Sequence, residues 1–189
     1  GIKFDGEFSV AAAPQVVYDM LSDPQKFAPL LPTYRSLEAR DDGTTDVTVE
    51  VGVGKIRGSA VINLALEGQE APRRAAYSGK GKVMGSTFNM QTAFDLEEVA
   101  GGGTRVKWEG DLSMFGKLVA LAGGLIRPIA KKDIQRLIDA IQAALSPGQW
   151  YGMNTVSGRM VATTWADSVI APRRDVTVTR SPSATPIRS

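Results

Sequence analysis

Alternating apolar and polar residues cover most of the first 115 positions and predict a β-rich domain. The clearest stretch is Thr45–Val53, where every second residue from Val47 to Val53 is valine. A two-residue period of this kind is typical of a strand with one buried face. The same period predicts strands at residues 3–10, 34–40, 55–67, 74–82, 87–99 and 104–112. Short turns join most of these segments, so we expect about seven strands in an antiparallel sheet.

A helical period appears in three places. Two short helices are predicted after the first strand, at residues 11–21 and 23–31, with Pro14 and Pro24 near their starts. The third, Gly116–Leu145, carries apolar residues three or four positions apart. A helix of roughly 30 residues is about 45 Å long, so it needs a large partner surface. We therefore predict an α+β fold, in which a curved sheet wraps around the long C-terminal helix and leaves a hollow between them.

The chain is expected to divide near the end of that helix. Residues 1–145 form the predicted ligand-binding domain, and Ser146-Pro147-Gly148 stops the helix. The tail, residues 146–189, has an apolar and aromatic part at 150–170 and a basic part rich in Pro, Ser and Thr after it. The second part is expected to be flexible. The aromatic part could pack on the body, on a second copy or on a partner.

The composition excludes several kinds of chemistry. The 189 residues include no Cys and no His, which rules out disulfides, thiol nucleophiles and Cys/His metal sites. We expect no metal and no catalytic residue. Residues 1–145 carry 17 basic and 18 acidic side chains, so no nucleic-acid partner is expected. No apolar run is long enough to span a membrane, and Gly1–Val10 resembles a strand more than a signal peptide, so we expect a cytoplasmic protein.

Apolar residues at several loop tips predict the mouth of the hollow. If the strands alternate in direction along the chain, four tips meet at one end of the sheet. They carry Phe27, Leu30, Leu31, Val53, Met84, Met114 and Phe115, with Lys26, Lys55, Lys82 and Lys117 beside them. Apolar tips ringed by lysine suit contact with an anionic membrane surface. Alternatively, these side chains cap the core.

Residues on the inner strand faces and the long helix are the candidate ligand contacts. They are Phe27, Leu30, Leu31, Val49, Val51, Ile62, Tyr77, Met90, Trp108, Leu112, Leu121 and Leu125, with Val53, Met84, Met114, Phe115 and Lys117 at the portal rim. Trp108 offers a flat ring and one N–H donor. Tyr77 is the best inward polar group. Glu109 and Asp111 share the strand face opposite Trp108, where solvated carboxylates are expected.

The element order resembles the helix-grip fold of the START and birch-pollen-allergen superfamily (Bet v 1-like, SRPBCC). Within it, the chain is similar to the carbon monoxide dehydrogenase G-subunit (CoxG) family. The similarity rests on Gly6-Glu7-Phe8, on Val17–Leu21 followed by Asp23-Pro24, and on Gly116–Ile126. It covers about residues 1–145.

The resemblance implies a function as well as a fold. Members of the superfamily enclose an apolar ligand, and the CoxG family accompanies a molybdenum hydroxylase that it is implicated in attaching to the membrane. A quinone, menaquinone or ubiquinone, or another lipid is then the expected ligand, and the inner face of the cell membrane the expected location. Two alternatives stay open. One is an enzyme of the polyketide cyclase or dehydratase type, with Tyr77 or a buried carboxylate moving the proton. The other is an assembly protein that binds the oxidase and no ligand.

Overall fold

The computed structural model describes residues 1–145, 152–156 and 159–163. The chain divides into two compact units, Gly1–Gly148 and Gln149–Ser189. In the second unit, β8 (Gly152–Val156) and β9 (Arg159–Thr163) pair as an antiparallel hairpin. The remaining expectations for the tail, including those for Trp150 and Trp165, fall on residues outside the described ranges.

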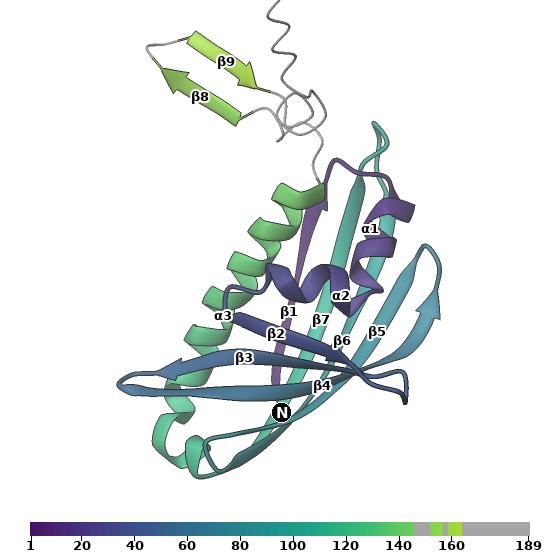
Figure 1. The fold of residues 1–189 in the computed structure, drawn as a ribbon. Coiled ribbons are helices and arrows are strands. Elements are labelled where there is room, and N and C mark those ends of the chain that lie inside the picture. The colour runs from purple at the N-terminus through teal and green to yellow at the C-terminus, as the bar shows by residue number, and fades with distance from the viewer. Residues whose placement is uncertain (146–151, 157–158, 164–189) are drawn as a thin grey trace, which may run out of the picture. The chain divides into compact units, whose positions relative to one another are not determined.

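Seven strands form one antiparallel sheet in the first unit, as the alternating pattern predicts. They are β1 (Ile2–Val10), β2 (Tyr34–Ala39), β3 (Thr45–Val53), β4 (Ile56–Glu70), β5 (Arg74–Val83), β6 (Ser86–Glu98) and β7 (Thr104–Gly116). Their spatial order is β1-β7-β6-β5-β4-β3-β2. Strands β2 to β7 are therefore neighbours in chain order, whereas β1 lies beside β7 (Figure 1).

The helices begin and end close to the predicted positions. α1 (Pro14–Leu21) and α2 (Pro24–Phe27) both start with a proline, and the Asp23 side chain accepts a hydrogen bond from the backbone N–H of Gln25 at the start of α2. A short 3-10 turn, η1 (Ala28–Leu30), follows. α3 (Lys117–Leu145) runs along one flank of the sheet (Figure 1).

Two apolar clusters lie on the inner face of the sheet. One joins α1 and the C-terminal half of α3 to the strands around Phe8, Val10 and Val106. The other joins η1 and the start of α3 to β3, β4, β5 and β6 around Val47 and Leu64. α3 therefore packs on both clusters, with its C-terminal half on the first and its N-terminal half on the second.

Side-chain hydrogen bonds hold α3 to the sheet at its start and along β1. The Leu118 N–H donates to the buried Oγ of Ser86 at 2.8 Å, which satisfies a free donor in the first turn of the helix. Along β1, Arg127 donates to the Lys3 carbonyl at 3.1 Å and Gln142 donates to the Ser9 carbonyl at 3.0 Å. Two backbone carbonyls on the outer edge of β1 thus accept hydrogen bonds from α3.

Candidate functional site

A cavity of about 290 Å³ lies between the inner face of the sheet and α3. Its wall is almost wholly apolar. Its apolar lining comes from the strands (Phe4, Phe8, Val47, Ile62, Leu64, Met90, Phe94, Trp108 and Leu112), from α2 and the residue after η1 (Phe27 and Leu31), and from α3 (Ala130, Ile134, Leu137, Ile138 and Ile141). Tyr77, Gln91, Thr92, Gly110 and Asp111 complete the wall. This volume is near the lower limit of small-ligand pockets. The interior can therefore hold an apolar group.

Trp108 borders this cavity and rests on a glycine of the neighbouring strand. Gly6 and Trp108 are register partners in the β1–β7 pair. A Cβ atom on Gly6 would lie 2.9 Å from Cζ2 and 3.0 Å from Nε1 of the indole, so only glycine leaves room for the ring. The Nε1 donor is buried and has no hydrogen-bond partner among the described residues. Trp108 thus faces the interior, as the alternation in β7 predicts.

Tyr77 also faces the interior, but its hydroxyl is already engaged. The ring packs edge-on against Phe27, with centroids 5.5 Å apart and planes at 69°. The hydroxyl donates to the Leu21 carbonyl at 2.8 Å, and burial raises the pKa of Tyr77 above its ordinary value. A phenol that is held protonated and hydrogen-bonded to the backbone ties α1 to the sheet and leaves no free group for proton transfer.

A larger cleft, of about 1330 Å³, runs between α3 and the inner side of β3 and β4. It shares four lining residues with the cavity, namely Ile62, Met90, Leu112 and Ala130. The cleft therefore adjoins the apolar interior. Asp133 of α3 lies on its wall, and the pKa of this carboxyl is raised by burial, although Arg136 and Lys132 act in the opposite direction.

Of the two carboxylates that the sequence offered for acid–base chemistry, Glu109 lies away from the cavity, whereas Asp111 borders it with a buried Oδ1 that has no hydrogen-bond partner among the described residues. Glu109 alternates with Trp108 on β7, is exposed, and approaches Arg74 at 3.8 Å. Among the described residues, no three His, Cys, Asp or Glu side chains gather as a metal site. No described helix is both long and apolar enough to cross a bilayer.

Residues 6–146 match the family of the carbon monoxide dehydrogenase G subunit, CoxG. The chain belongs to this family. No curated protein matches it significantly in sequence.

Solved structures share the CoxG chain's fold at low sequence identity. A conserved protein from Geobacillus kaustophilus is 17% identical with a TM-score of 0.69, covering 76% of this chain and 95% of its own. A START superfamily protein from Mycobacterium smegmatis is 14% identical with a TM-score of 0.58, covering 77% of this chain and 97% of its own. The fold of this CoxG chain is therefore START-like.

Most of the predicted ligand contacts line one of the two hollows. Phe27, Leu31, Ile62, Tyr77, Met90, Trp108 and Leu112 line the cavity. Val49 and Val51 line the cleft, together with Val53 and Met114, which were predicted for the portal rim. Leu30 lines neither and packs instead against the cluster around Phe8. The side chain of Leu121 lies outside the described part of the chain. The role of these residues in ligand binding remains a prediction.

The prediction that Leu125 faces the interior is wrong. Its side chain is 50% exposed, whereas the adjacent Ile126 is buried. The inner face of α3 passes through Leu118, Ile126 and Ile129. Neighbouring helical residues point about 100° apart, so once Ile126 packs inward Leu125 turns towards solvent.

Three of the four predicted tips, namely the β3–β4 turn, the β5–β6 turn and the end of β7, do lie at one end of the sheet, but the prediction that β1 ends there and starts the short helices there is wrong. Phe115 at the end of β7 lies beside Thr87 at the β5–β6 turn. Val10, where β1 ends, instead pairs with Thr104 at the opposite end of β7. Because β1 pairs with the last strand, α1 begins at the far end of the sheet from Phe115. α2 then lies over the inner face of the sheet, where the Phe27 ring packs against Tyr77 of β5.

The remaining rim residues lie near the Phe115 end but line neither hollow. Met84 has a positive φ of 47° in the β5–β6 turn, and its side chain reaches Gly58 of β4. Phe115 is 61% exposed and Lys117 is exposed at the start of α3. These positions form a surface and not the wall of an opening.

Sequence reasoning missed the part of the cavity wall that comes from β1 and the second half of α3. Phe4 and Phe8 line it from β1, and Ile134, Leu137, Ile138 and Ile141 line it from α3. The helical stripe contained this signal, since the last four residues recur three or four apart. Placing Phe4 and Phe8 required knowledge that β1 lies next to β7.

Proposed function

We propose that this CoxG chain is a non-catalytic carrier for an apolar small molecule, a quinone or another lipid, gripped between the sheet and α3. The observation that carries the proposal is the cavity of about 290 Å³ with its nearly unbroken apolar wall. Burial of apolar ligand surface contributes roughly 25 cal/mol per Å². A ligand in contact with Trp108, Met90 and Ile62 gains this energy without needing a charged partner.

The proposed partner is a molybdenum-containing oxidase of the carbon monoxide dehydrogenase type. Membership of the CoxG family supports this partner. A carrier that accompanies such an oxidase would move a quinone between the enzyme and the inner face of the cell membrane. The polyketide cyclase alternative loses one of its two kinds of candidate acid, because the Tyr77 hydroxyl donates to the Leu21 carbonyl.

Contact with the membrane is proposed for the end of the sheet that carries Phe115. Ile56 at the start of β4 and Phe115 at the end of β7 are large apolar side chains exposed to solvent. Lys55 directly precedes Ile56, and Lys117 follows Phe115 by two residues. Exposed apolar side chains flanked by lysine suit insertion between anionic headgroups. Phe115→Asp should abolish sedimentation with phosphatidylglycerol vesicles and, because the residue is exposed, leave the melting temperature within about 2 °C. Unchanged sedimentation would refute this surface.

The carrier function is tested by extracting the purified protein with organic solvent and analysing the extract by mass spectrometry. We expect a stoichiometric quinone or lipid. Met90→Trp should displace it, because Met90 lines the cavity. Asn89→Trp is the matched control, since Asn89 is the preceding residue of β6 and is exposed. Extracts without any such compound, and no uptake of added quinone or lipid by the wild-type protein, would refute the carrier and favour an assembly protein.

A further inference from the structure

The outer face of the sheet, which is turned away from the cavity, carries exposed apolar side chains near the Phe115 end. The strand register aligns one residue from each of four strands in a single row on this face: Val61 of β4, Lys82 of β5, Thr87 of β6 and Phe115 of β7. Val61 is 47% exposed and Phe115 is 61% exposed. Because neighbouring strands lie about 4.8 Å apart, the row is about 14 Å long. It therefore forms a continuous surface and not a loop tip.

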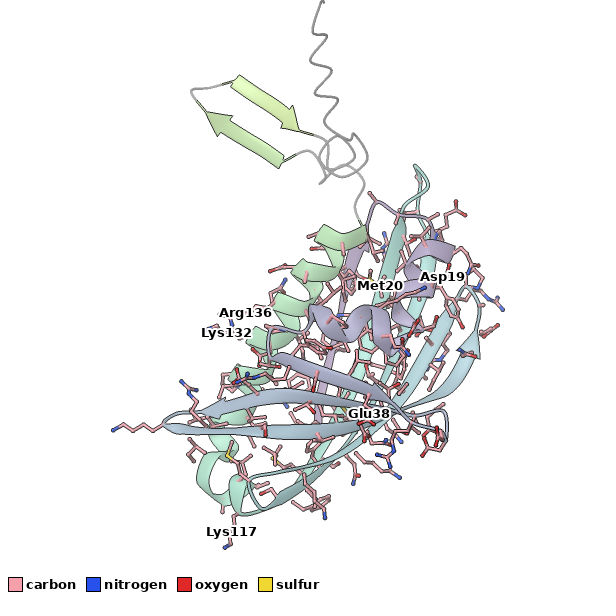
Figure 2. The ribbon with its side chains drawn as sticks, in the orientation of Figure 1. Asp19, Met20, Glu38, Lys117, Lys132 and Arg136 are labelled. Carbon is pink, nitrogen blue, oxygen red and sulfur yellow. The ribbon has the colours of Figure 1, made fainter. Side chains whose placement is uncertain are left out.

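Unpaired basic side chains surround this row. Lys80 lies two residues before Lys82 and so shares the outer face of β5. Arg57 lies four residues before Val61 and so shares the outer face of β4. Figure 2 shows the Lys117 side chain extending away from the body at the start of α3. Within the described residues, none of these four cations has an acidic side chain within ion-pair distance.

The outer face changes sign towards its other end. The two carboxylates nearest the basic row on β3, Asp46 and Glu50, are paired with Arg40 and Arg35. From the row of Ser78, Gln91 and Asp111 onwards, carboxylates outnumber cations. This part of the face carries Asp5, Glu7, Glu67, Asp95, Glu97, Glu109 and Asp111 against Lys3, Arg74, Arg105 and Lys107. The outer face therefore has a positive, partly apolar half and a negative half.

We infer that the positive half of this outer face lies against an anionic bilayer, so that the domain contacts the membrane with the side of its sheet. The inference rests on the membrane contact of the proposed function and extends it from the strand ends at Ile56 and Phe115 to the outer face of β4, β5 and β6. An anionic leaflet attracts each nearby basic side chain, and the exposed Val61 gains an apolar contact between headgroups. The same leaflet repels the negative half, and this separation of charge selects one orientation.

Two fluorescent labels on β6 test the orientation. The chain has no Cys, so Asn89→Cys and Glu97→Cys each give the full-length protein a single site for an environment-sensitive dye. Both positions are exposed on the outer face of β6, and eight strand residues separate them by about 26 Å.

On phosphatidylglycerol vesicles we expect the dye at position 89 to shift to shorter wavelength and the dye at position 97 to stay unchanged. If the protein sediments with the vesicles but neither dye shifts, or both shift equally, the inference is overturned and the membrane contact stands. If the protein does not sediment at all, the proposed membrane contact fails as well.

Two lysines on opposite sides of the sheet provide matched charge variants. Lys82→Gln should weaken binding to phosphatidylglycerol vesicles about fivefold, which corresponds to about 1 kcal/mol. Lys26→Gln removes the same charge from α2, which lies over the inner face, and should have little effect. Thermal unfolding checks that both variants remain folded. Equal weakening by the two variants would show that only net charge matters, and binding of the wild type to neutral phosphatidylcholine vesicles with the same affinity would show that charge does not matter; either result overturns the inference.

Discussion

Replacing Gly6 by alanine tests how Trp108 is held against the sheet. The new Cβ would lie 2.9 to 3.0 Å from three atoms of the indole, whereas ordinary contact begins at 3.4 Å. The ring must therefore move by roughly 0.5 Å, and overpacking of this kind costs about 1–3 kcal/mol. Because Trp108 borders the cavity, the ring can move partly into it. We expect a cost of about 1–2 kcal/mol, which lowers the melting temperature by about 3–8 °C.

Thermal unfolding followed by circular dichroism measures this loss, and Gly68→Ala is the control. A Cβ on Gly68 meets only the Cβ of Ala76, at an ordinary 3.7 Å, so this variant should melt within about 2 °C of the wild type. With Trp150 and Trp165 replaced by Phe, Gly6→Ala should also change the fluorescence of Trp108. If Gly6→Ala has the same melting temperature as the Gly68→Ala control and its Trp108 emission is unchanged, the indole does not rest on Gly6 and the β1–β7 register is wrong.

Three further substitutions test single contacts. Tyr77→Phe removes the 2.8 Å hydrogen bond to the buried Leu21 carbonyl and should lower the free energy of unfolding by about 1–2 kcal/mol in denaturant titrations; a change below about 0.3 kcal/mol would contradict this role. Ser86→Ala removes the acceptor of the Leu118 N–H and should cost about 1 kcal/mol in the same assay, with equal stability as the refuting result. Burial raises the pKa of Asp133, so its charged form opposes folding above that pKa and this cost disappears as the carboxyl is protonated. Asp133→Asn should therefore melt higher than the wild type at pH 7 and level with it near pH 3, whereas equal melting at both values would show that the carboxyl is solvated.

Local periodicity predicted the strands well, because each pattern depends only on nearby residues. Thr45–Val53 has the same bounds in the sequence prediction and in the structure. β4 and β7 continue to Glu70 and Gly116, beyond their predicted ends. In both extensions the regular alternation of apolar and polar residues weakens, since these strand ends are less buried. Pairing with a neighbouring strand, and not burial, keeps them extended.

The site was harder to predict, because its geometry depends on contacts between distant parts of the chain. Nothing local to Val10 indicates that β1 pairs with β7, and this pairing decides where α1 begins. It was equally hard to predict which residues of α3 between Leu118 and Ile129 face the interior, because the adjacent residues Leu125 and Ile126 are both apolar. Trp108, by contrast, was placed correctly, since two-residue alternation runs through Val106 and Leu112 on the same face.

The hydrogen bonds from Arg127 and Gln142 to β1 also limit how copies of this domain can associate. A sheet has two edges, and each free edge can accept a strand from another molecule. Here the Lys3 and Ser9 carbonyls on the β1 edge already accept hydrogen bonds from side chains of α3. Within residues 1–145, α3 therefore covers part of the β1 edge, and the opposite edge of the sheet is β2. Two copies that pair through their β2 edges use the same surface on each copy, and the hydrogen bonds from α3 hinder the addition of a further strand at β1.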